Sequence, residues 1–209
     1  MTRLLSERLI RWLAVTCNQQ GCLLIEVSSQ LDYISMERSQ NMILKEIPTS
    51  SLELNPFLAI GKDMMLVTSG GGTSWNTLTA SWGGMGELWE RDVIFIFIRR
   101  SRYTHEFLEK SGSFTCSFFP PEYKDKLLYL GTHSGRDENK IAKTGLTCKI
   151  LRGERMTFEE ANLVFSCTKA SKTEILPEQF IDPSIAKHYD NLDYHTLYVG
   201  FVDVTYAAF

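Results

Sequence analysis

The fold is decided by the stretch VIFIFIRRSRYT, residues 93–104, in which an apolar run is followed at once by basic and hydroxyl residues. Val93–Ile98 contains only β-branched and aromatic residues, which predicts a central barrel strand buried on both faces. Three arginines then stand where this strand turns into the start of a helix. Backbone N–H groups at a helix start and guanidinium groups both favour an anion, typically a phosphate. A solvated basic turn would have the same composition.

Short apolar segments of the same kind follow along the chain. They predict strands at Met64–Ser69, Leu78–Trp82, Val93–Arg99, Phe114–Phe118, Ala161–Ala170 and Thr196–Tyr206. Start and stop signals predict short helices at Thr104–Glu109, Glu122–Leu130, Glu138–Lys143 and Pro183–Tyr189, with Thr104 and Asp137 as N-caps and Gly112, Gly131 and Gly145 beyond the ends. Successive strands with short peripheral helices favour a mainly β, closed or partly closed barrel over a βαβ array.

Composition limits the classes of partner and compartment. The 209 residues accommodate one domain with appendages. Lys and Arg number 22 against 25 Asp and Glu, and without a basic block we expect no nucleic-acid or membrane partner. The 5 cysteines are widely spread, which fits a reducing, cytoplasmic compartment better than a disulfide framework. No apolar stretch reaches the roughly 20 residues that a membrane-spanning helix needs.

Residues 1–41 share none of this patterning. We therefore divide the chain into an N-terminal extension of uncertain status, residues 1–41, and a barrel domain, residues 42–209. Arg3, Arg8 and Arg11 precede a short apolar patch, but polar residues interrupt the patch before it reaches the length of a signal peptide. The extension is either an appended helix or an artefact of the start site, and no function is assigned to it.

Several familiar motifs are incomplete or absent. The run SGGG at 69–72 lacks the Gly-Lys-Ser/Thr ending of a P-loop and is predicted to be a hairpin turn. Cys17 and Cys22 have no second Cys/His pair at metal-binding spacing, so no metal site is expected. The sequence has neither a G-x-S-x-G elbow nor an H-E-x-x-H pair, which leaves a hydrolase without support.

Two further clusters of polar residues accompany the predicted strands. The first, NTLTASWGG at 76–84, alternates small hydroxyl residues with apolar ones. Such a strand can lay its backbone against a flat ring because the facing side chains are short, although an ordinary strand with one polar face has the same pattern. The second, HSGRD at 133–137 with Lys140 one turn later, places basic residues at another helix start.

Together these runs resemble the flavin reductase-like proteins with the FMN-binding split barrel, specifically their flavoredoxin-like branch. The resemblance rests on NTLTASWGG, IRRSRYTHEFLEKSGSFTCSFF, GTHSGRDENK and DYHTLYVG, which follow one another in order between about Leu54 and Val204. It implies a Greek-key split β-barrel that forms a homodimer and binds FMN non-covalently near the subunit interface.

The resemblance also implies roles for individual residues. The residues that would line the flavin ring and ribityl chain are Asn76, Thr77, Leu78, Thr79, Ala80, Ser81 and Trp82. The residues that would hold the phosphate are Arg100, Ser101, Arg102, Thr104, Arg136 and Lys140. His195 matches the histidine that in many relatives lies near the reactive edge of the flavin, and it is the expected catalytic residue. Tyr194 precedes it, where the two-component reductases often have Asp.

The implied function is electron transfer from NADH or NADPH through FMN to a flavin, ferric or protein acceptor. An alternative is a flavoredoxin-like electron carrier that a redox partner protein reduces and that has little NAD(P)H turnover of its own. A third is a binding protein that stores FMN or a related tetrapyrrole. FMN is expected rather than FAD because the sequence has one phosphate-binding cluster and no adenosine site. No residue is expected to act as a nucleophile.

Overall fold

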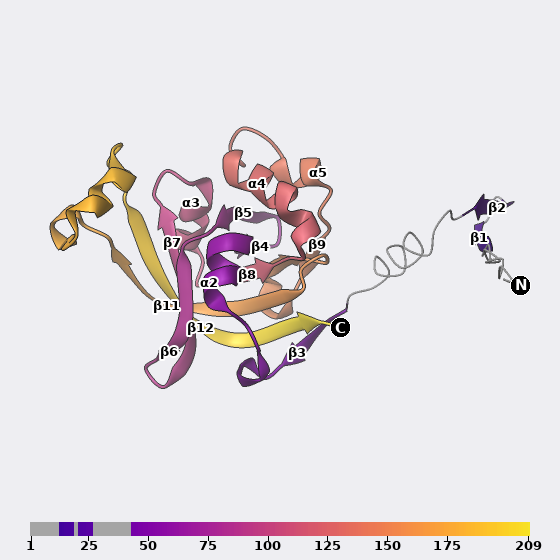
Figure 1. The fold of residues 1–209 in the computed structure, drawn as a ribbon, viewed down its shortest axis with the longest axis horizontal. Coiled ribbons are helices and arrows are strands. Elements are labelled where there is room, and N and C mark those ends of the chain that lie inside the picture. The colour runs from indigo at the N-terminus through magenta and orange to yellow at the C-terminus, as the bar shows by residue number, and fades with distance from the viewer. Residues whose placement is uncertain (1–12, 19–20, 27–42) are drawn as a thin grey trace, which may run out of the picture. The chain divides into compact units, whose positions relative to one another are not determined.

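A computed structural model of the chain describes residues 13–18, 21–26 and 43–209 (Figure 1). The chain divides into two compact units, Met1–Met42 and Ile43–Phe209. In the first unit, β1 (Leu13–Asn18) and β2 (Gly21–Glu26) form an antiparallel hairpin, so these residues are strands and not the appended helix considered from the sequence. The rest of the extension lies outside the described residues. No described helix is long and apolar enough to span a membrane.

The second unit is built on an eight-stranded sheet in which neighbouring strands are antiparallel. The strands are β3 (Leu44–Ile47), β4 (Met65–Gly71), β5 (Ser74–Ala80), β6 (Gly83–Leu88), β7 (Arg91–Arg99), β8 (Ser113–Phe118), β11 (Leu163–Glu174) and β12 (His195–Ala208). Their order is β5-β4-β8-β11-β12-β7-β6, and β3 pairs with the end of β12.

The two ends of this order, β5 and β6, are consecutive in the chain and are joined only by Ser81 and Trp82. The order is therefore that of a sheet split between β5 and β6, and the predicted mainly β split barrel is confirmed. Ser81 and Trp82, which link these two strands, therefore lie at the split. The hydrogen bonding between neighbouring strands is interrupted there.

Short helices and one small sheet surround the strands (Figure 1). The α-helices are α2 (Pro56–Leu58), α3 (Tyr103–Lys110), α4 (Lys124–Thr132) and α5 (Lys140–Thr144), and η2 (Ala59–Asp63) is a π-helix. The 3-10 segments are η1 (Thr49–Ser51), η3 (Pro121–Tyr123), η4 (Arg152–Glu154), η5 (Pro177–Gln179) and η6 (Pro183–Tyr189). The small sheet pairs β9 (Cys148–Ile150) with β10 (Met156–Phe158).

Alternation along β4 shows how the core is arranged. Met65 and Val67 belong to one buried cluster, whereas Leu66 belongs to a second cluster that contains Leu127 and Leu130 of α4. All three β4 side chains are 0% exposed, so both faces of this strand are covered. Covered faces on both sides explain why β4 is apolar at successive positions.

The prediction for Val93–Ile98 was wrong in two respects. Ile94, Ile96 and Ile98 are buried, but Phe95 and Phe97 on the other face of β7 are half-buried. β7 is also next to last in the sheet order and is not central. An all-apolar run therefore arises here because one face packs in the core and the other carries aromatic side chains beside a surface hollow.

Several predicted ends of elements were also wrong. Helix α3 begins one residue before Thr104, and Arg102 occupies the N-cap position. Asn139 caps α5 in place of Asp137 by accepting from the Ala142 N–H at 3.2 Å. Gly131 lies inside α4, and the second strand runs from Ser74 to Ala80 instead of continuing to Trp82. Asp, Asn and Thr can all cap a helix, so local sequence does not determine which of several neighbouring residues is the N-cap. Tertiary contacts determine it.

The SGGG run forms the predicted hairpin turn. Gly71 pairs with Ser74 across the β4–β5 hairpin. Gly70 and Gly72 have φ values of 93° and 56°, a region in which residues with a Cβ are strained. The run is therefore structural, as its incomplete P-loop pattern indicated.

Candidate functional site

Two adjoining cavities lie where β5, the end of β7 and the helices α3 and α4 approach one another. The ring cavity, about 300 Å³, is lined by Leu78, Thr79, Ala80, Ser81, Trp82, Phe97, Ile98, Arg99, Arg102, Gly131 and His195. The polar cavity, about 150 Å³, is lined by Asn76, Leu78, Ser101, Arg102, Tyr103, Thr104, Thr132, His133, Ser134, Gly135 and Lys140. Leu78 and Arg102 line both, so the two cavities form one continuous site.

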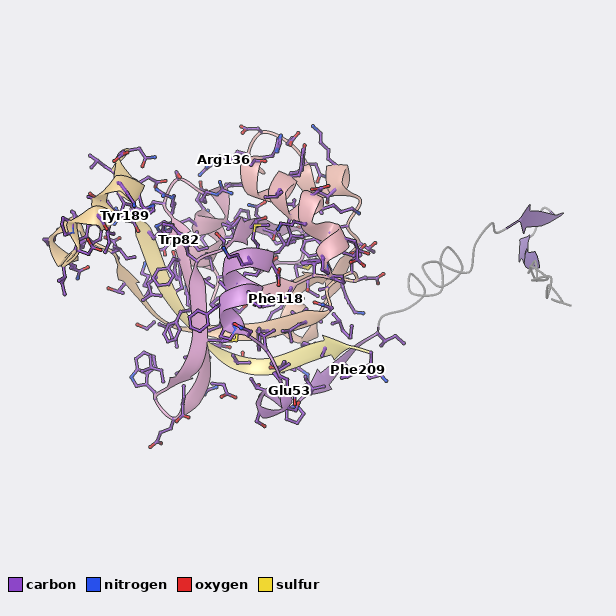
Figure 2. The ribbon with its side chains drawn as sticks, in the orientation of Figure 1. Glu53, Trp82, Phe118, Arg136, Tyr189 and Phe209 are labelled. Atoms are coloured by element: carbon purple, nitrogen blue, oxygen red, sulfur yellow. The ribbon has the colours of Figure 1, made fainter. Side chains whose placement is uncertain are left out.

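Trp82 and His195 form one wall of the ring cavity. Trp82, labelled in Figure 2, lies on the linker across the split. Trp82 is 42% exposed, whereas His195, which begins β12, is 6% exposed. Their ring centroids are 4.8 Å apart at a tilt of 37°. Flat apolar surface of this kind suits a planar aromatic ligand, because stacked rings gain dispersion and quadrupole energy.

His195 is neutral at pH 7. Burial, followed by the charge of Arg99, lowers the pKa of His195 to about 4. Its Nδ1 lies 2.9 Å from the hydroxyl of Tyr189. Arg99 donates to the backbone carbonyls of His188 and Asp193, at 2.9 Å each, and so ties the segment that carries Tyr189 to the end of β7.

The polar cavity is organised around the N-terminus of α3. Asn76 of β5 donates from Nδ2 to Oγ1 of Thr104 at 2.8 Å, and both side chains are buried. Arg102, at the N-cap, makes no side-chain cap hydrogen bond. The first N–H groups of α3 therefore have no side-chain acceptor from the cap, and the partial positive charge of the helix end favours an anion.

One buried and one half-buried cation, Lys140 and Arg102, increase this preference for an anion. Lys140 is 3% exposed, and its Nζ donates to the carbonyls of Leu130 at 2.7 Å and His133 at 3.1 Å. Burial, followed by the charge of Arg102, lowers the pKa of Lys140 to about 8. Burial also lowers the pKa of Arg102, whose guanidinium donates to the Gly131 carbonyl. Two like charges held together in a polar cavity gain most from a bound anion.

Two glycines let the α4–α5 region approach β5. A Cβ placed on Gly135 would lie 2.4 Å from Oδ1 of Asn76, and one on Gly131 would lie 3.1 Å from Cβ of Thr79. The donor set and the flat wall beside it fit a phosphorylated planar heteroaromatic molecule. Ligand sites commonly have volumes of roughly 300–1,000 Å³, and the joined cavities reach that range.

Not all the predicted site residues line these cavities. Thr77 lies against the neighbouring strand, where its hydroxyl donates to the Val67 carbonyl at 3.2 Å. Arg100 is half-exposed and pairs with Glu174. Arg136 lines an adjoining hollow of about 440 Å³, which shares Asn76, Tyr103, Gly135 and Lys140 with the polar cavity, and it pairs with Glu106 at 2.5 Å. Thr77 and Arg100 therefore lie apart from the two cavities, and Arg136 lines only the adjoining hollow. The other eleven predicted cofactor-binding and catalytic positions line the two cavities, with the Ser101 hydroxyl donating to Asp193 at 2.5 Å.

Four residues that line or support the cavities had no individual site role predicted from the sequence: Arg99, Gly131, Gly135 and Tyr189. Arg99 belongs to the basic cluster that was expected to favour an anion. Gly131 and Gly135 lie within the GTHSGRDENK run, so that run contained a signal for them. Nothing in the sequence connects Tyr189 with His195, because their contact depends on how the segment between β11 and β12 folds back.

Comparisons with known proteins agree with this architecture. Residues 58–205, more than half of the chain, match the flavin reductase like domain. A search of curated proteins finds no match.

Three solved structures illustrate the fold. Flavoredoxin of Desulfovibrio vulgaris has a TM-score of 0.56 at 20% identity, with 78% of this chain and 76% of that chain covered. An FMN-binding domain of a flavin reductases-like enzyme from Shewanella baltica has a TM-score of 0.56 at 15% identity, covering 79% and 77%. The Streptomyces globisporus NADH:FAD oxidoreductase has a TM-score of 0.53 at 13% identity, covering 87% and 86%. The chain belongs to the flavin reductase-like family.

Proposed function

We propose that the protein binds FMN in the joined cavities and transfers electrons through it from a reduced nicotinamide to a flavin, ferric or protein acceptor. One observation carries the proposal: a cavity with a flat aromatic wall opens directly into a cavity that contains buried Lys140, half-buried Arg102 and a helix N-terminus. A flavin mononucleotide has the matching parts, a planar ring system and one phosphate.

The residues divide between these two parts. Trp82, His195 and the backbone from Thr79 to Ser81 would bind the ring system, and Arg102, Thr104 and Lys140 would bind the phosphate. A bound flavin supplies the redox chemistry, while the protein supplies position and electrostatics. His195 would act as a neutral hydrogen-bonding group because its pKa of about 4 leaves it uncharged at pH 7.

The electron donor distinguishes an enzyme from a carrier. The similarity to an NADH:FAD oxidoreductase favours a nicotinamide, and the similarity to a flavoredoxin favours a protein donor. We expect the protein to purify yellow, to release FMN on denaturation, and to lose its flavin absorbance rapidly when mixed anaerobically with NADH or NADPH in a stopped-flow instrument. Bleaching only over hours would contradict the reductase proposal and support the carrier. Colourless protein with no thermal shift on adding FMN would contradict both.

We also propose that the protein is a homodimer. An apolar hollow of about 540 Å³ is lined by Pro56, Phe57, Ile60, Gly61, Ser81, Trp82, Gly83, Gly84, Met85, Phe97 and Ile175. It adjoins the ring cavity, with which it shares Ser81, Trp82 and Phe97. Phe57 is 85% exposed at its rim. Apolar surface of this kind commonly marks a protein interface.

Light scattering is expected to give a dimer, and Phe57→Asp is expected to give a monomer because the new carboxylate would lose its hydration in the interface. Phe209→Asp is the matched control, since Phe209 is 73% exposed but does not line the hollow. A wild-type monomer, or a Phe57→Asp dimer as stable as the control, would contradict the proposal.

The proposed compartment is the cytoplasm. Cys116 and Cys167 are buried free thiols in the barrel, and Cys148 is an exposed free thiol. Free thiols are typical of reducing compartments, where they are kept from oxidation.

A further inference from the structure

The segment between β11 and β12, residues 175–194, contributes one buried side chain to the neighbourhood of the ring cavity. Residues 181–188 are exposed, whereas Tyr189 is 5% exposed (Figure 2). The Tyr189 ring stacks on both Phe180 and Tyr194, with centroid distances of 5.5 Å and 4.9 Å, and these two rings also contact each other. Its hydroxyl lies 2.9 Å from Nδ1 of His195. One residue of an otherwise exposed segment therefore makes a specific polar contact with the buried side chain of His195.

The direction of this hydrogen bond follows from the partners available. In the described part of the chain, Nδ1 of His195 is the only recorded partner of the Tyr189 hydroxyl. In that part of the chain the hydroxyl proton therefore has an acceptor only if it is donated to Nδ1, because an Nδ1–H that donated to the hydroxyl would leave the hydroxyl proton without a partner. A neutral imidazole that accepts at Nδ1 carries its own proton on Nε2.

The other ring nitrogen of His195 has no hydrogen-bond partner among the described residues. Nε2 of His195 makes no recorded hydrogen bond, yet no buried side-chain nitrogen or oxygen among the described residues lacks a partner. Nε2 is therefore accessible, and the space next to His195 is the ring cavity that it lines with Trp82.

We propose that Tyr189 is a positioning residue: its hydroxyl donates to Nδ1 of His195, fixes the imidazole in the Nε2–H tautomer, and so presents an N–H donor to the ring cavity. The role of this donor toward a bound flavin rests on the proposed function. The tautomer itself does not, because it depends only on residues of this chain.

Nitrogen NMR of the flavin-free protein at pH 7.5 tests the tautomer directly. We expect the ring proton of His195 on Nε2 and an unprotonated Nδ1 with the shift of a hydrogen-bond acceptor. Tyr189→Phe keeps the stacked ring and removes the hydroxyl, so the Nδ1 signal should move toward that of a free imidazole nitrogen. Tyr194→Phe is the matched control, since it removes a hydroxyl from the adjacent ring and should leave the signals unchanged.

A wild-type protein with the proton on Nδ1 or on both nitrogens would overturn the proposal. So would a Tyr189→Phe spectrum that matches the wild-type spectrum. Thermal denaturation of the two Phe variants shows whether each is folded, and neither loses its ring from the aromatic stack.

Flavin affinity tests the consequence for the site. We expect Tyr189→Phe to weaken FMN binding about threefold to tenfold, the loss typical of one neutral hydrogen bond. In a His195→Gln background, whose amide can still donate but has no Nδ1, Tyr189→Phe should have no further effect. An equal loss in both backgrounds would contradict action through His195. Absence of FMN binding in every variant, with the predicted NMR signals, would contradict the proposed function and leave the tautomer assignment intact.

Discussion

Arg102→Ala is expected to weaken FMN binding about tenfold to a hundredfold while leaving riboflavin binding nearly unchanged. Arg102 lies at the N-cap of α3 and lines the polar cavity together with buried Lys140. A charge-assisted hydrogen bond contributes about 1.5–3 kcal/mol, and each 1.4 kcal/mol changes a dissociation constant about tenfold. Riboflavin has the same ring system without a phosphate, so its affinity reports the ring cavity alone. Fluorescence titration with both flavins measures the difference.

Arg100→Ala is the matched control, because Arg100 lies two residues earlier, pairs with Glu174 and lines neither cavity. It should leave both affinities within about twofold, the limit expected for an exposed ion pair. Thr104→Val should weaken FMN as Arg102→Ala does, and Thr104→Ser should restore most of the loss. Equal losses for FMN and riboflavin would contradict the phosphate assignment and indicate that these residues act by stabilising α3.

Acid is expected to destabilise the flavin-free protein in a way that His195→Gln removes. Burial lowers the pKa of His195 from 6.5 to about 4. Between those values the unfolded chain takes up a proton that the folded chain does not, so the free energy of unfolding falls as the pH falls. One unit of pKa difference corresponds to about 1.4 kcal/mol, which gives a loss on the order of 2–3 kcal/mol from pH 7 to pH 4.

Urea denaturation at a series of pH values measures this loss. The His195→Gln protein should be less sensitive to acid by about that amount, whatever its stability at pH 7. Other groups also titrate in this range, including His105, whose pKa burial lowers as well. Parallel curves for wild type and variant would show that His195 takes up its proton at the same pH in the folded and unfolded states, and would contradict its lowered pKa.

The sequence predicted the class of fold because its strands are short, β-branched and separated by turn residues. The β4 and β8 segments are predicted to within one or two residues, since each is an apolar run with polar or glycine residues at its ends. Strand β6 was missed because GGMGEL has three glycines and low β-propensity. Its formation depends on pairing with β7, a tertiary contact that local propensity does not report.

The polar part of the site was predictable for a different reason. Ser101, Arg102 and Thr104 are close in sequence and lie on one helix start, so a local pattern describes them. Arg100 belongs to the same pattern but lies on the outside, where Glu174 of β11 pairs with it. The sequence pattern shows that basic residues are concentrated here, but it does not show which way each side chain points. The position of each residue relative to the sheet determines that direction.

The central claim is that the joined cavities hold FMN, and a crystal structure of the protein grown with FMN tests it most directly. We expect the phosphate in the polar cavity, within hydrogen-bond distance of Arg102 or Thr104, and the ring system in the ring cavity against Trp82, with Nε2 of His195 facing it. A flavin bound elsewhere on the chain, or with its phosphate outside the polar cavity, would contradict the account.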